Sequence, residues 1–527
     1  MTHDVIVLGA GPNGLAAAAT LAAKGRKVLL LEQRDLPGGL AAAEEFHPGY
    51  RTAGLLPDCS AVPDELIADL MLEQHGLRRR GAAPSRYAPE PGGPGLLLPA
   101  DPLAAETAVA ARSPRDAEGL ARLRGFVGRV RPLVQRLLLR PPPPLAPSGV
   151  TAAAPLVDLG LRLRQLGRDD LHEVLRVAPM AVRDWLGEHL DDELLKATLC
   201  APTLIGTWLG PWSAGTAALL LLREARSGPG LLGGAPTLVR ALLAAAQAGG
   251  AVLRLDAPVR RILVEDGVVR GVEVGGPNPA ATERLEAPAV LSTLDPRQTF
   301  LRLLSLGDGP AALAHEMRSW RCRGTAAVLH LALNGPLEFA ARPGDAIELA
   351  SIAPSLVALE RAFDAVKYRR MSEHPVMDVC VPTVSDPSLA PPGHHVVSAL
   401  IGHAPYELGD GGWTDDARAA LLQRSLDTLH AHAPGLRDRI VAHQLLTPAD
   451  LEARYNLTGG HLHHGEQALD QLFWLRPAAA CARYATPIPG LFIGGSGSHP
   501  GGGLSGVPGW LAAKAVLRGR ARVQRLG

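Results

Sequence analysis

A glycine-rich turn near the amino terminus constrains the fold of this chain more than any other feature. Residues 3–8 (HDVIVL) have the pattern of a short buried strand, residues 15–24 that of an alanine-rich helix, and residues 27–31 (KVLLL) that of a second buried strand. The turn between the first strand and the helix has the spacing G-x-G-x-x-G, formed by Gly9, Gly11 and Gly14. This order of elements predicts a Rossmann-type dinucleotide site in an α/β fold.

Each residue of the turn has an expected task. Gly9 permits the tight turn, Gly11 lets a pyrophosphate approach the backbone, and Gly14 lets the helix pack on the strand. Glu32 ends the second strand, where a carboxylate can accept hydrogen bonds from a ribose diol and would repel the 2′-phosphate of NADP. A purely structural glycine turn is the alternative, and the flanking strands and terminal acid favour the dinucleotide site.

Composition narrows the class of partner. Lys plus Arg (53) nearly cancel Asp plus Glu (52), so no overall positive field indicates a nucleic acid, and a small molecule is the expected partner. The five cysteines include no C-x-x-C pair, which disfavours a disulfide framework, a zinc knuckle and a redox dithiol. The chain enters an apolar run by Val5, and no apolar run approaches the roughly 18 residues of a membrane-spanning helix. We therefore expect a cytoplasmic protein.

The residues after the second strand indicate which dinucleotide is bound. Residues 32–39 (EQRDLPGG) resemble the E-x-R-x-x-x-G-G signature of the FAD-dependent amine oxidase and phytoene desaturase superfamily. The resemblance implies FAD as the cofactor, with contacts from Glu32, Arg34, Gly38 and Gly39. The arginine that follows the glycine pair in that superfamily is replaced by Leu40, which removes one cation near the cofactor.

A second glycine segment lies near the carboxyl end. Residues 489–509 begin as a strand and pass through a glycine-rich loop into an apolar helix over 510–517. They resemble the carboxyl-terminal flavin motif of phytoene-dehydrogenase-like enzymes. That resemblance implies that Gly494, Gly495 and Ser496 lie along the pyrophosphate and ribityl chain, and that Gly506 and Val507 lie beside the isoalloxazine. A flexible linker would not be flanked by an apolar strand and an apolar helix.

The middle of the chain completes the expected cofactor domain. We predict a helix over 236–248, strands over 251–255 and 289–293, and a hairpin of strands 258–264 and 268–274 around the turn Asp266-Gly267. In the resembled superfamily this order supplies a three-stranded meander over the nucleotide, with the backbone of Val259 meeting adenine.

These segments divide the chain into two domains. We predict an FAD-binding domain from residues 1–75, 230–299 and 452–527, and a substrate-binding α+β domain of sheet and helices from residues 76–229 and 300–451. The pattern predicts a mostly helical first block with a stiff proline connector at 141–144. The second block is expected to hold strands at 326–333, 376–381 and 395–401 and a helix from the N-cap Thr414 to His432. The leucine-rich stretch 133–139 is compatible with peripheral contact to a membrane surface or with a buried helix.

A histidine-rich stretch, GGHLHHG at 459–465, raises the question of a metal site. Its H-x-H-H spacing lacks the i, i+4 pair of a helical zinc site, and no Cys or distant His/Asp cluster completes one, so we predict no metal. The longer segment 456–477 resembles a hallmark of the phytoene-dehydrogenase-related flavoproteins, in the subgroup that includes pyridine nucleotide-disulfide oxidoreductase domain-containing protein 2. The matching positions are Gly459, Gly460, His464, Gly465, Asp470, Gln471, Arg476 and Pro477.

The resulting hypothesis is an FAD-dependent oxidoreductase of the desaturase or dehydrogenase type. A hydride would pass from a substrate C–H bond to flavin N5 and leave a double bond. His464 is the candidate acid/base or substrate-polarising group, with hydrogen bonding to loop backbone as the alternative. Arg476 is a candidate anchor for an anionic substrate group or the cofactor, with a structural salt bridge as the alternative. His499 is expected to pack beside the ring.

Other functions stay open at this point. A flavin amine oxidase is one, although its aromatic cage cannot be located among only seven Phe and six Tyr residues. A redox-neutral flavin isomerase is another, and a non-enzymatic binding protein like the GDP dissociation inhibitors is disfavoured by the intact glycine segments. The expected substrate is lipophilic or like a natural product. The sequence does not identify the electron acceptor, for which oxygen and a quinone both stay open.

Overall fold

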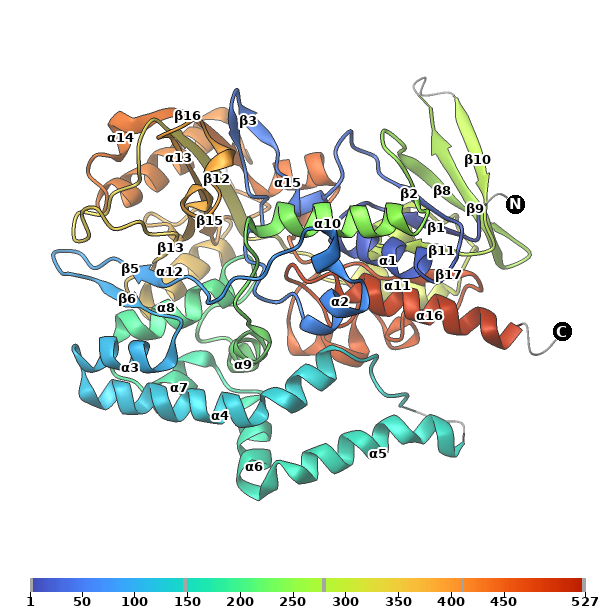
Figure 1. Cartoon of the computed structure of the whole chain (residues 1–527), viewed down its shortest axis with the longest axis horizontal. Helices are drawn as coiled ribbons and strands as arrows, with labels where there is room; N and C mark the ends of the chain where they lie inside the picture. The colour runs from blue at the N-terminus through green and yellow to red at the C-terminus, as the bar shows by residue number, and fades with distance from the viewer. Residues whose placement is uncertain (1–2, 146–148, 277–280, 410, 524–527) are drawn as a thin grey trace.

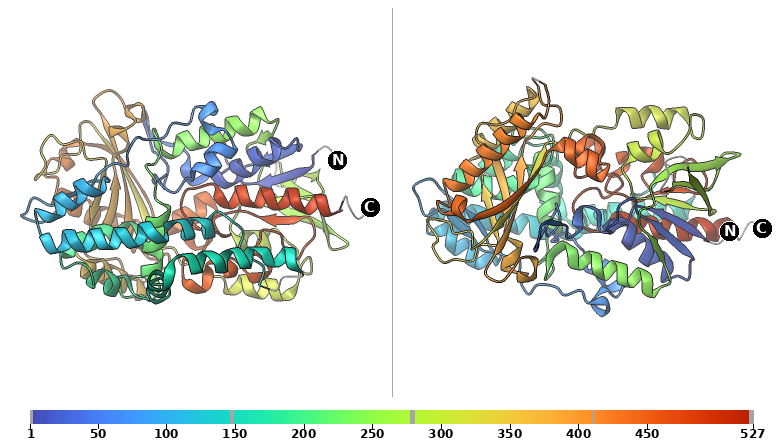
Figure 2. Two further views of the ribbon diagram at one scale, coloured as in Figure 1. Left: turned by 60° about the horizontal axis from the view of Figure 1, so that its bottom comes forward. Right: turned by 90° about the horizontal axis from the view of Figure 1, so that it is seen from above.

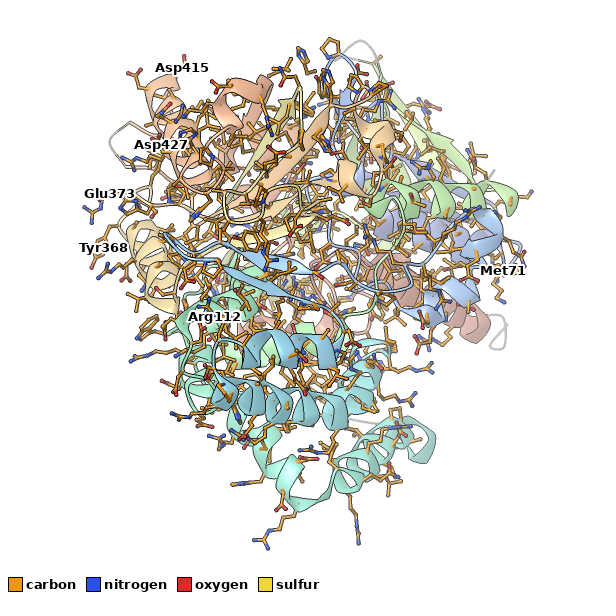
Figure 3. The ribbon with its side chains drawn as sticks, turned by 60° about the vertical axis from the view of Figure 1, so that its left-hand side comes forward. Met71, Arg112, Tyr368, Glu373, Asp415 and Asp427 are labelled. Atoms are coloured by element: carbon orange, nitrogen blue, oxygen red, sulfur yellow. The ribbon has the colours of Figure 1, made fainter. Side chains whose placement is uncertain are left out.

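The computed structural model describes residues 3–145, 149–276, 281–409 and 411–523. Figure 1 shows a large sheet toward each end of the long axis, with helices α3 to α9 along the lower side. The two further views in Figure 2 keep the sheets at opposite ends. In Figure 3 the exposed Met71 lies on the side of the molecule opposite to Tyr368 and Asp415.

A five-stranded parallel sheet gathers strands from the start, middle and end of the chain. Its order is β17 (Leu491–Ile493), β11 (Val290–Ser292), β1 (Val5–Leu8), β2 (Val28–Leu31) and β7 (Val252–Arg254). Helices α1 (Pro12–Ala22), α10 (Gly234–Ala248) and α16 (Val507–Val523) pack together beside it (Figure 1). This sheet confirms the α/β fold class and the predicted strand, turn, helix and strand at the amino terminus.

The residues buried around the five-stranded sheet explain why these segments form strands and helices that pack together. Every residue of β1 and β2 is buried, as their uninterrupted apolar runs predict. Helix α1 places alanines 16–19 in the same cluster as leucines of α10 and α16. Small side chains let these helices approach each other and the sheet closely.

The predicted hairpin forms as part of a three-stranded antiparallel sheet. Strands β8 (Val259–Glu265), β9 (Val268–Gly275) and β10 (Thr282–Glu286) pair in the order β10-β9-β8. Asp266 and Gly267 have φ of 50° and 73°, the left-handed conformation that a two-residue hairpin turn requires. Asp-Gly is a preferred pair for such a turn, which is why the sequence identified it.

A seven-stranded mixed sheet forms the other large layer. Its order is β16 (Ile440–Leu446), β12 (Ala326–Leu333), β15 (His395–Gly402), β14 (Val376–Cys380), β13 (Leu349–Ile352), β5 (Arg86–Ala88) and β6 (Leu96–Leu98). The strands predicted over 326–333, 376–381 and 395–401 are thus confirmed. The predicted long helix is α13 (Asp415–His430), and the hydroxyl of its N-cap Thr414 accepts a hydrogen bond from the Ala417 N–H at 3.2 Å.

The first block between the cofactor segments is less purely helical than its composition predicts. Strands β5 and β6 extend the seven-stranded sheet, with β5 parallel to β13. These strands are short and are stabilised by pairing with residues far away in the chain, which leaves no local periodicity to detect. The α-helices of this block are α3 (Pro102–Ala110), α4 (Pro114–Leu138), α5 (Val150–Gln165), α6 (Gly167–Val177), α7 (Val182–Gly187), α8 (Glu193–Leu204) and α9 (Thr216–Arg226).

The leucine-rich stretch at the end of α4 lies inside the protein. Leu133 and Leu138 are each only 5% exposed, and Leu138 packs against Ala225 of α9. This burial favours the buried-helix alternative for the stretch, and peripheral contact with a membrane stays a prediction. Within the described ranges, no helix has the length and apolarity to cross a bilayer.

The other α-helices and strands are α2 (Asp64–Asp69), α11 (Ala311–Ser319), α12 (Leu356–Lys367), α14 (Leu436–Arg439), α15 (Pro448–Tyr455), β3 (Glu45–His47) and β4 (Tyr50–Arg51). The domain boundaries given above stay predictions.

Candidate cofactor and substrate site

The first glycine turn has the shape that a dinucleotide site requires. Gly9 has a φ of 90°, and a Cβ on Gly14 would lie 1.8 Å from the Gly9 carbonyl oxygen, so the turn and the helix contact both exclude side chains. Gly11 is different, because a Cβ there would meet only the Gly39 Cα, at 4.0 Å. The space in front of Gly11 is therefore free of protein atoms. Gly11 is also the N-cap of α1, where backbone N–H groups favour a phosphate.

Glu32 is held firmly at the end of β2. One carboxylate oxygen accepts the Ala10 N–H at 2.8 Å and the other accepts the Arg34 N–H at 3.1 Å, and the residue is only 7% exposed. Each oxygen has a further lone pair, so the same carboxylate can accept hydrogen bonds from ribose hydroxyls. The interaction with Ala10 fixes the carboxylate against the glycine turn.

The second predicted loop packs backbone to backbone against the first. Gly38 has a φ of 119°, and a Cβ on Gly39 would lie 3.2 Å from the Gly11 Cα. Arg34 forms an ion pair with Glu44 at 2.7 Å and lies over the Tyr455 ring. One of its terminal nitrogens, Nη1, is buried without a partner among the described residues, which leaves a donor for a cofactor oxygen.

The carboxyl-terminal glycine segment reaches the same place. Gly494 and Gly495 are packed too closely for side chains, since a Cβ on Gly495 would lie 2.4 Å from the Thr293 oxygen. The Ser496 hydroxyl accepts a hydrogen bond from the Asn13 amide at 3.3 Å. Gly506 has a φ of 72° and faces Ala16 of α1, and the buried Val507 begins α16. The amino-terminal ends of α1 and α16 therefore lie together, which suits a diphosphate between them.

Val259 lies at the start of β8, opposite Val274 of β9. It is partly buried and packs against the cluster that includes β1 and β2. Contact of its backbone with adenine stays a prediction. Together, the open space at Gly11, the fixed carboxylate of Glu32, the unpartnered Arg34 nitrogen and the paired helix ends fit a flavin dinucleotide.

The histidine stretch forms a compact loop in which the three imidazoles have different environments. His461 is fully buried, its Nδ1 accepts the His463 N–H at 3.2 Å, and burial lowers its pKa to about 3. His463 accepts the Gly503 N–H on Nδ1 at 3.2 Å, and burial holds its pKa well below the usual range. This arrangement places the remaining proton of neutral His463 on Nε2.

His464 differs from His461 and His463 in its backbone conformation. It has a φ of 56°, and its carbonyl accepts a hydrogen bond from the Trp320 indole at 3.1 Å. Its Nδ1 is buried without a partner among the described residues, and burial lowers its pKa, opposed by nearby Asp295. The predicted acid/base role of His464 is not tested by this geometry.

Arg476 stabilises the histidine loop through hydrogen bonds to backbone carbonyl groups. It is fully buried, and its guanidinium donates to the carbonyl oxygens of five residues, His463, Gly465, Glu466, Gln471 and Ser496, at 2.8–3.3 Å. These bonds use every N–H of the side chain. The geometry therefore favours a structural role, held by carbonyls rather than by a salt bridge, and leaves no donor for a substrate.

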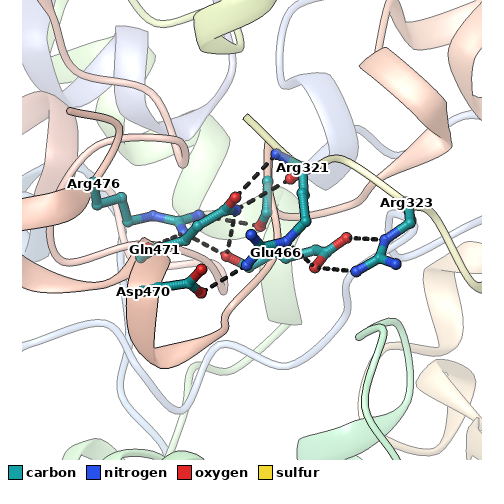
Figure 4. A network of polar contacts seen from close by, with 7 residues as sticks. Arg321, Arg323, Glu466, Asp470, Gln471 and Arg476 are labelled. Atoms are coloured by element: carbon teal, nitrogen blue, oxygen red, sulfur yellow. Dashed lines mark hydrogen bonds and ion pairs between the residues drawn. The ribbon is translucent and has the colours of Figure 1, made fainter. Parts of the chain in front are cut away.

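A polar network continues from this arginine to the protein surface. Arg321 and Arg323 both pair with Glu466, at 3.1 Å and 2.6 Å, and Arg321 also pairs with Asp470 (Figure 4). The Gln471 side chain bridges Arg321 and the Glu466 carbonyl. Several of the hallmark positions therefore fix the shape of the loop.

His499 lies within the carboxyl-terminal glycine segment. Its Nε2 lies 2.9 Å from the Leu137 carbonyl oxygen, its ring packs 5.9 Å from that of Phe473, and burial lowers its pKa to about 4. The ring is neutral and hydrogen-bonded, and its expected place beside the flavin stays a prediction. Among the described residues, no group of three or more His, Cys, Asp or Glu side chains is placed to hold a metal ion.

A cavity of about 740 Å³ lies between the seven-stranded sheet and helices α4, α8 and α9. Its wall is largely apolar, with leucines from all of these elements, and it includes Gly503 and Leu504 of the carboxyl-terminal glycine segment. His463 lines the cavity, whereas His464 and Arg476 do not. A volume of this size suits an organic molecule of moderate size.

The fold and the two glycine segments define a flavin-binding oxidoreductase. The chain belongs to the family described as flavin containing amine oxidoreductase, which matches residues 13–517. FAD is the cofactor of this protein class, and the chain is an FAD-dependent oxidoreductase.

Individual relatives span almost the whole chain. Pyridine nucleotide-disulfide oxidoreductase domain-containing protein 2 of Rattus norvegicus is 30% identical, over 98% of this chain and 93% of its own. A limonene dehydrogenase component of Castellaniella defragrans is 28% identical, over 98% and 94%. Phytoene desaturase (lycopene-forming) of Pantoea ananas is 26% identical, over 97% and 98%. The subgroup resemblance stated from the sequence is thereby confirmed.

A solved structure shares the fold. Cyclohexylamine oxidase from Brevibacterium oxydans has a TM-score of 0.59 at 17% identity, covering 99% of this chain and 100% of its own. At this identity the likeness concerns the fold alone.

Sequence reasoning missed several residues of the cavity. Arg226 and Trp185 lie on α9 and α7, in a block that carried no recognised motif. His463 is not among the positions that match the subgroup pattern, so the sequence did not single it out. The arginines at the end of an otherwise apolar helix, LLLREAR at 220–226, were the available signal for Arg226.

Proposed function

We propose that the chain dehydrogenates a largely apolar small molecule to form a carbon–carbon double bond. The observation that carries this proposal is the shared wall, since Gly503 and Leu504 belong both to the cavity and to the segment expected beside the flavin. Two relatives, named for limonene dehydrogenase and phytoene desaturase, support an apolar substrate.

The reaction removes two hydrogens from neighbouring carbons. One leaves as a hydride and the other as a proton, and the remaining electron pair forms the double bond. Bound FAD supplies the hydride acceptor. An external electron acceptor, oxygen or a quinone, then takes the two electrons. The chain's own residues orient the substrate and keep water away from it.

His463 is the histidine placed to act on a substrate. It lines the cavity, and its neutral ring with a proton on Nε2 can donate a hydrogen bond to a substrate oxygen or orient a water molecule. His464 stays a proposal for proton transfer, acting from outside the cavity wall. Arg476 positions both through their shared loop.

Amine oxidation is the runner-up on the same fold. Recognition of an ammonium group commonly uses a cage of aromatic rings. Among the described residues that line the cavity, Trp185 is the only Phe, Tyr or Trp. This composition supports oxidation at carbon over oxidation of an amine.

The five cysteines are free and buried. We propose a reducing compartment such as the cytoplasm, where free thiols persist.

Anaerobic reduction of the bound flavin tests the proposal. A panel of terpenes, apolar alcohols, carboxylic acids and amines is mixed with the flavin-loaded protein, and products are identified by mass spectrometry. We expect bleaching with a product two hydrogens lighter. Leu199→Trp would narrow the cavity and slow bleaching at unchanged flavin content, whereas Leu306→Trp on the surface, at a residue that is 99% exposed, would not. Bleaching by amines alone would contradict the proposal.

A further inference from the structure

The cavity contains a group of cations at the carboxyl end of α9. Arg223 and Arg226 occupy the last turn of this helix, and Arg131 of α4 donates to the carbonyl oxygens of Glu224 and Ser227, each at 3.1 Å. All three arginines line the cavity. We call Arg131, Arg223 and Arg226 the arginine cluster.

The members of this cluster are not equally neutralised. Arg223 lies 3.5 Å from Asp58 and 3.3 Å from Glu224, so it has carboxylate partners. Arg226 has no Asp or Glu of the described residues within ion-pair distance, and Asp58 attracts it only from farther away. Its Nη1 donates a hydrogen bond to the Gly502 carbonyl at 3.1 Å.

Among the described residues, Arg226 shares this lack of a carboxylate partner with Arg124 and Arg131, whereas two further arginines of the cavity wall are paired. Arg80 is paired with Glu348 and Arg86 with Asp378. Arg124, at the α3 side, donates to the Pro102 carbonyl at 3.4 Å. Burial lowers the pKa of Arg226, as expected for a cation removed from water with too little compensating charge.

Arg226 lies at the end of the cavity that borders the carboxyl-terminal glycine segment. A Cβ on Gly503 would lie 3.1 Å from its Nη2, so the guanidinium lies against the glycine segment that forms one wall. His463 also contacts this segment, through the Gly503 N–H, and is neutral. The Arg226 side chain therefore keeps N–H donors that no described residue accepts, at the end of the cavity formed by the glycine segment.

We propose that the substrate is an amphipathic carboxylic acid, whose carboxylate binds Arg226 while its apolar body fills the leucine-lined part of the cavity. This inference rests on the proposed function and names the substrate class. A carboxylate matches the planar fork of a guanidinium and supplies the charge that Arg226 lacks. The acid group then lies near the reacting carbons, and the oxidised bond is close to the carboxyl end of the molecule.

Binding measurements on the flavin-loaded protein test this inference. Straight-chain and terpenoid carboxylic acids are compared with their methyl esters and alcohols by calorimetry and by quenching of tryptophan fluorescence. We expect at least one acid to bind saturably and at least about tenfold more tightly than its neutral partners. Arg226→Gln is expected to weaken that acid about 10- to 100-fold and leave the ester unchanged, with Arg226→Lys intermediate.

Arg318→Gln is the matched control, because it removes the same charge at an exposed residue of α11 that does not line the cavity. It is expected to leave acid binding nearly unchanged. Three outcomes overturn the inference: no acid of the panel binds, acids and esters bind equally, or Arg226→Gln leaves acid binding unchanged. In each case an intact flavin spectrum and bleaching by a neutral substrate would leave the proposed function standing.

Discussion

The side-chain amide of Asn13 donates a hydrogen bond to the Ser496 hydroxyl at 3.3 Å, across 483 residues of sequence. This contact joins the first glycine turn to the carboxyl-terminal glycine segment. The two segments form one cofactor cradle because β17 returns to the sheet that begins with β1.

We expect Asn13→Ala to weaken FAD binding about 3- to 10-fold, the effect of losing one partly buried hydrogen bond. Fluorescence titration of the flavin-free protein measures this change. Asn334→Ala, on an exposed residue far from the cradle in the sequence, is the control. An unchanged FAD affinity would show that the contact does not help to form the cradle.

Arg476 is expected to support stability more than chemistry. Arg476→Lys cannot replace donors to five carbonyl groups, so the free energy of unfolding should fall by at least about 3 kcal/mol. Arg437→Lys, whose partner Asp427 is exposed, should cost less than about 1 kcal/mol. Urea unfolding measures both. A stable Arg476→Lys variant with impaired substrate affinity would instead favour direct substrate anchoring.

The histidine stretch gives a kinetic prediction once a substrate is known. His463→Ala should lower the rate of anaerobic flavin reduction, because the substrate loses the cavity-facing imidazole. His464→Ala should slow it about 100- to 10,000-fold if His464 transfers the proton. His461→Ala removes a buried acceptor and should change stability alone. Stopped-flow reduction at constant flavin content compares the three, and a wild-type rate in His464→Ala would return that residue to a structural role.

Buried neutral histidines should make the protein sensitive to acid. Burial lowers the pKa of His403 to about 4, below its usual value near 6.5 in the unfolded chain. Between these values the unfolded state binds more protons, so stability is full above about pH 6.5 and falls as the pH drops toward about 4.

The variant His403→Asn should reduce this loss. Asn tolerates the positive φ of 61° at this position and carries no titrating group. The exposed His374→Asn is the control. Thermal unfolding from pH 7 to pH 4 checks the prediction, and an identical pH profile for His403→Asn and wild type would contradict it.

The parts of the fold that sequence predicted are those encoded by local chemistry. Gly9, Gly14 and the pair Asp266-Gly267 are required by backbone conformation or close packing, so they mark their turns directly. Strands β5 and β6 escaped prediction because distant strands stabilise them.

The candidate site was predictable to the same limited extent. The cradle follows from glycine spacing, whereas Arg226 and His463 reach the cavity through the packing of α9 and the loop against the glycine segment. Arg476 was identified by position, yet its partners are carbonyl groups that no sequence pattern reveals.

The absorption spectrum of purified Gly11→Val, compared with wild type, tests the central claim most directly. The protein itself leaves room for this side chain, since the nearest atom to a Cβ at Gly11 is 4.0 Å away, so the variant should fold. Valine would occupy the place expected for the pyrophosphate. We predict wild type with bound FAD and a folded, colourless Gly11→Val, while Gly128→Val on the exposed face of α4 keeps its flavin. A folded Gly11→Val with a full flavin spectrum would contradict the account.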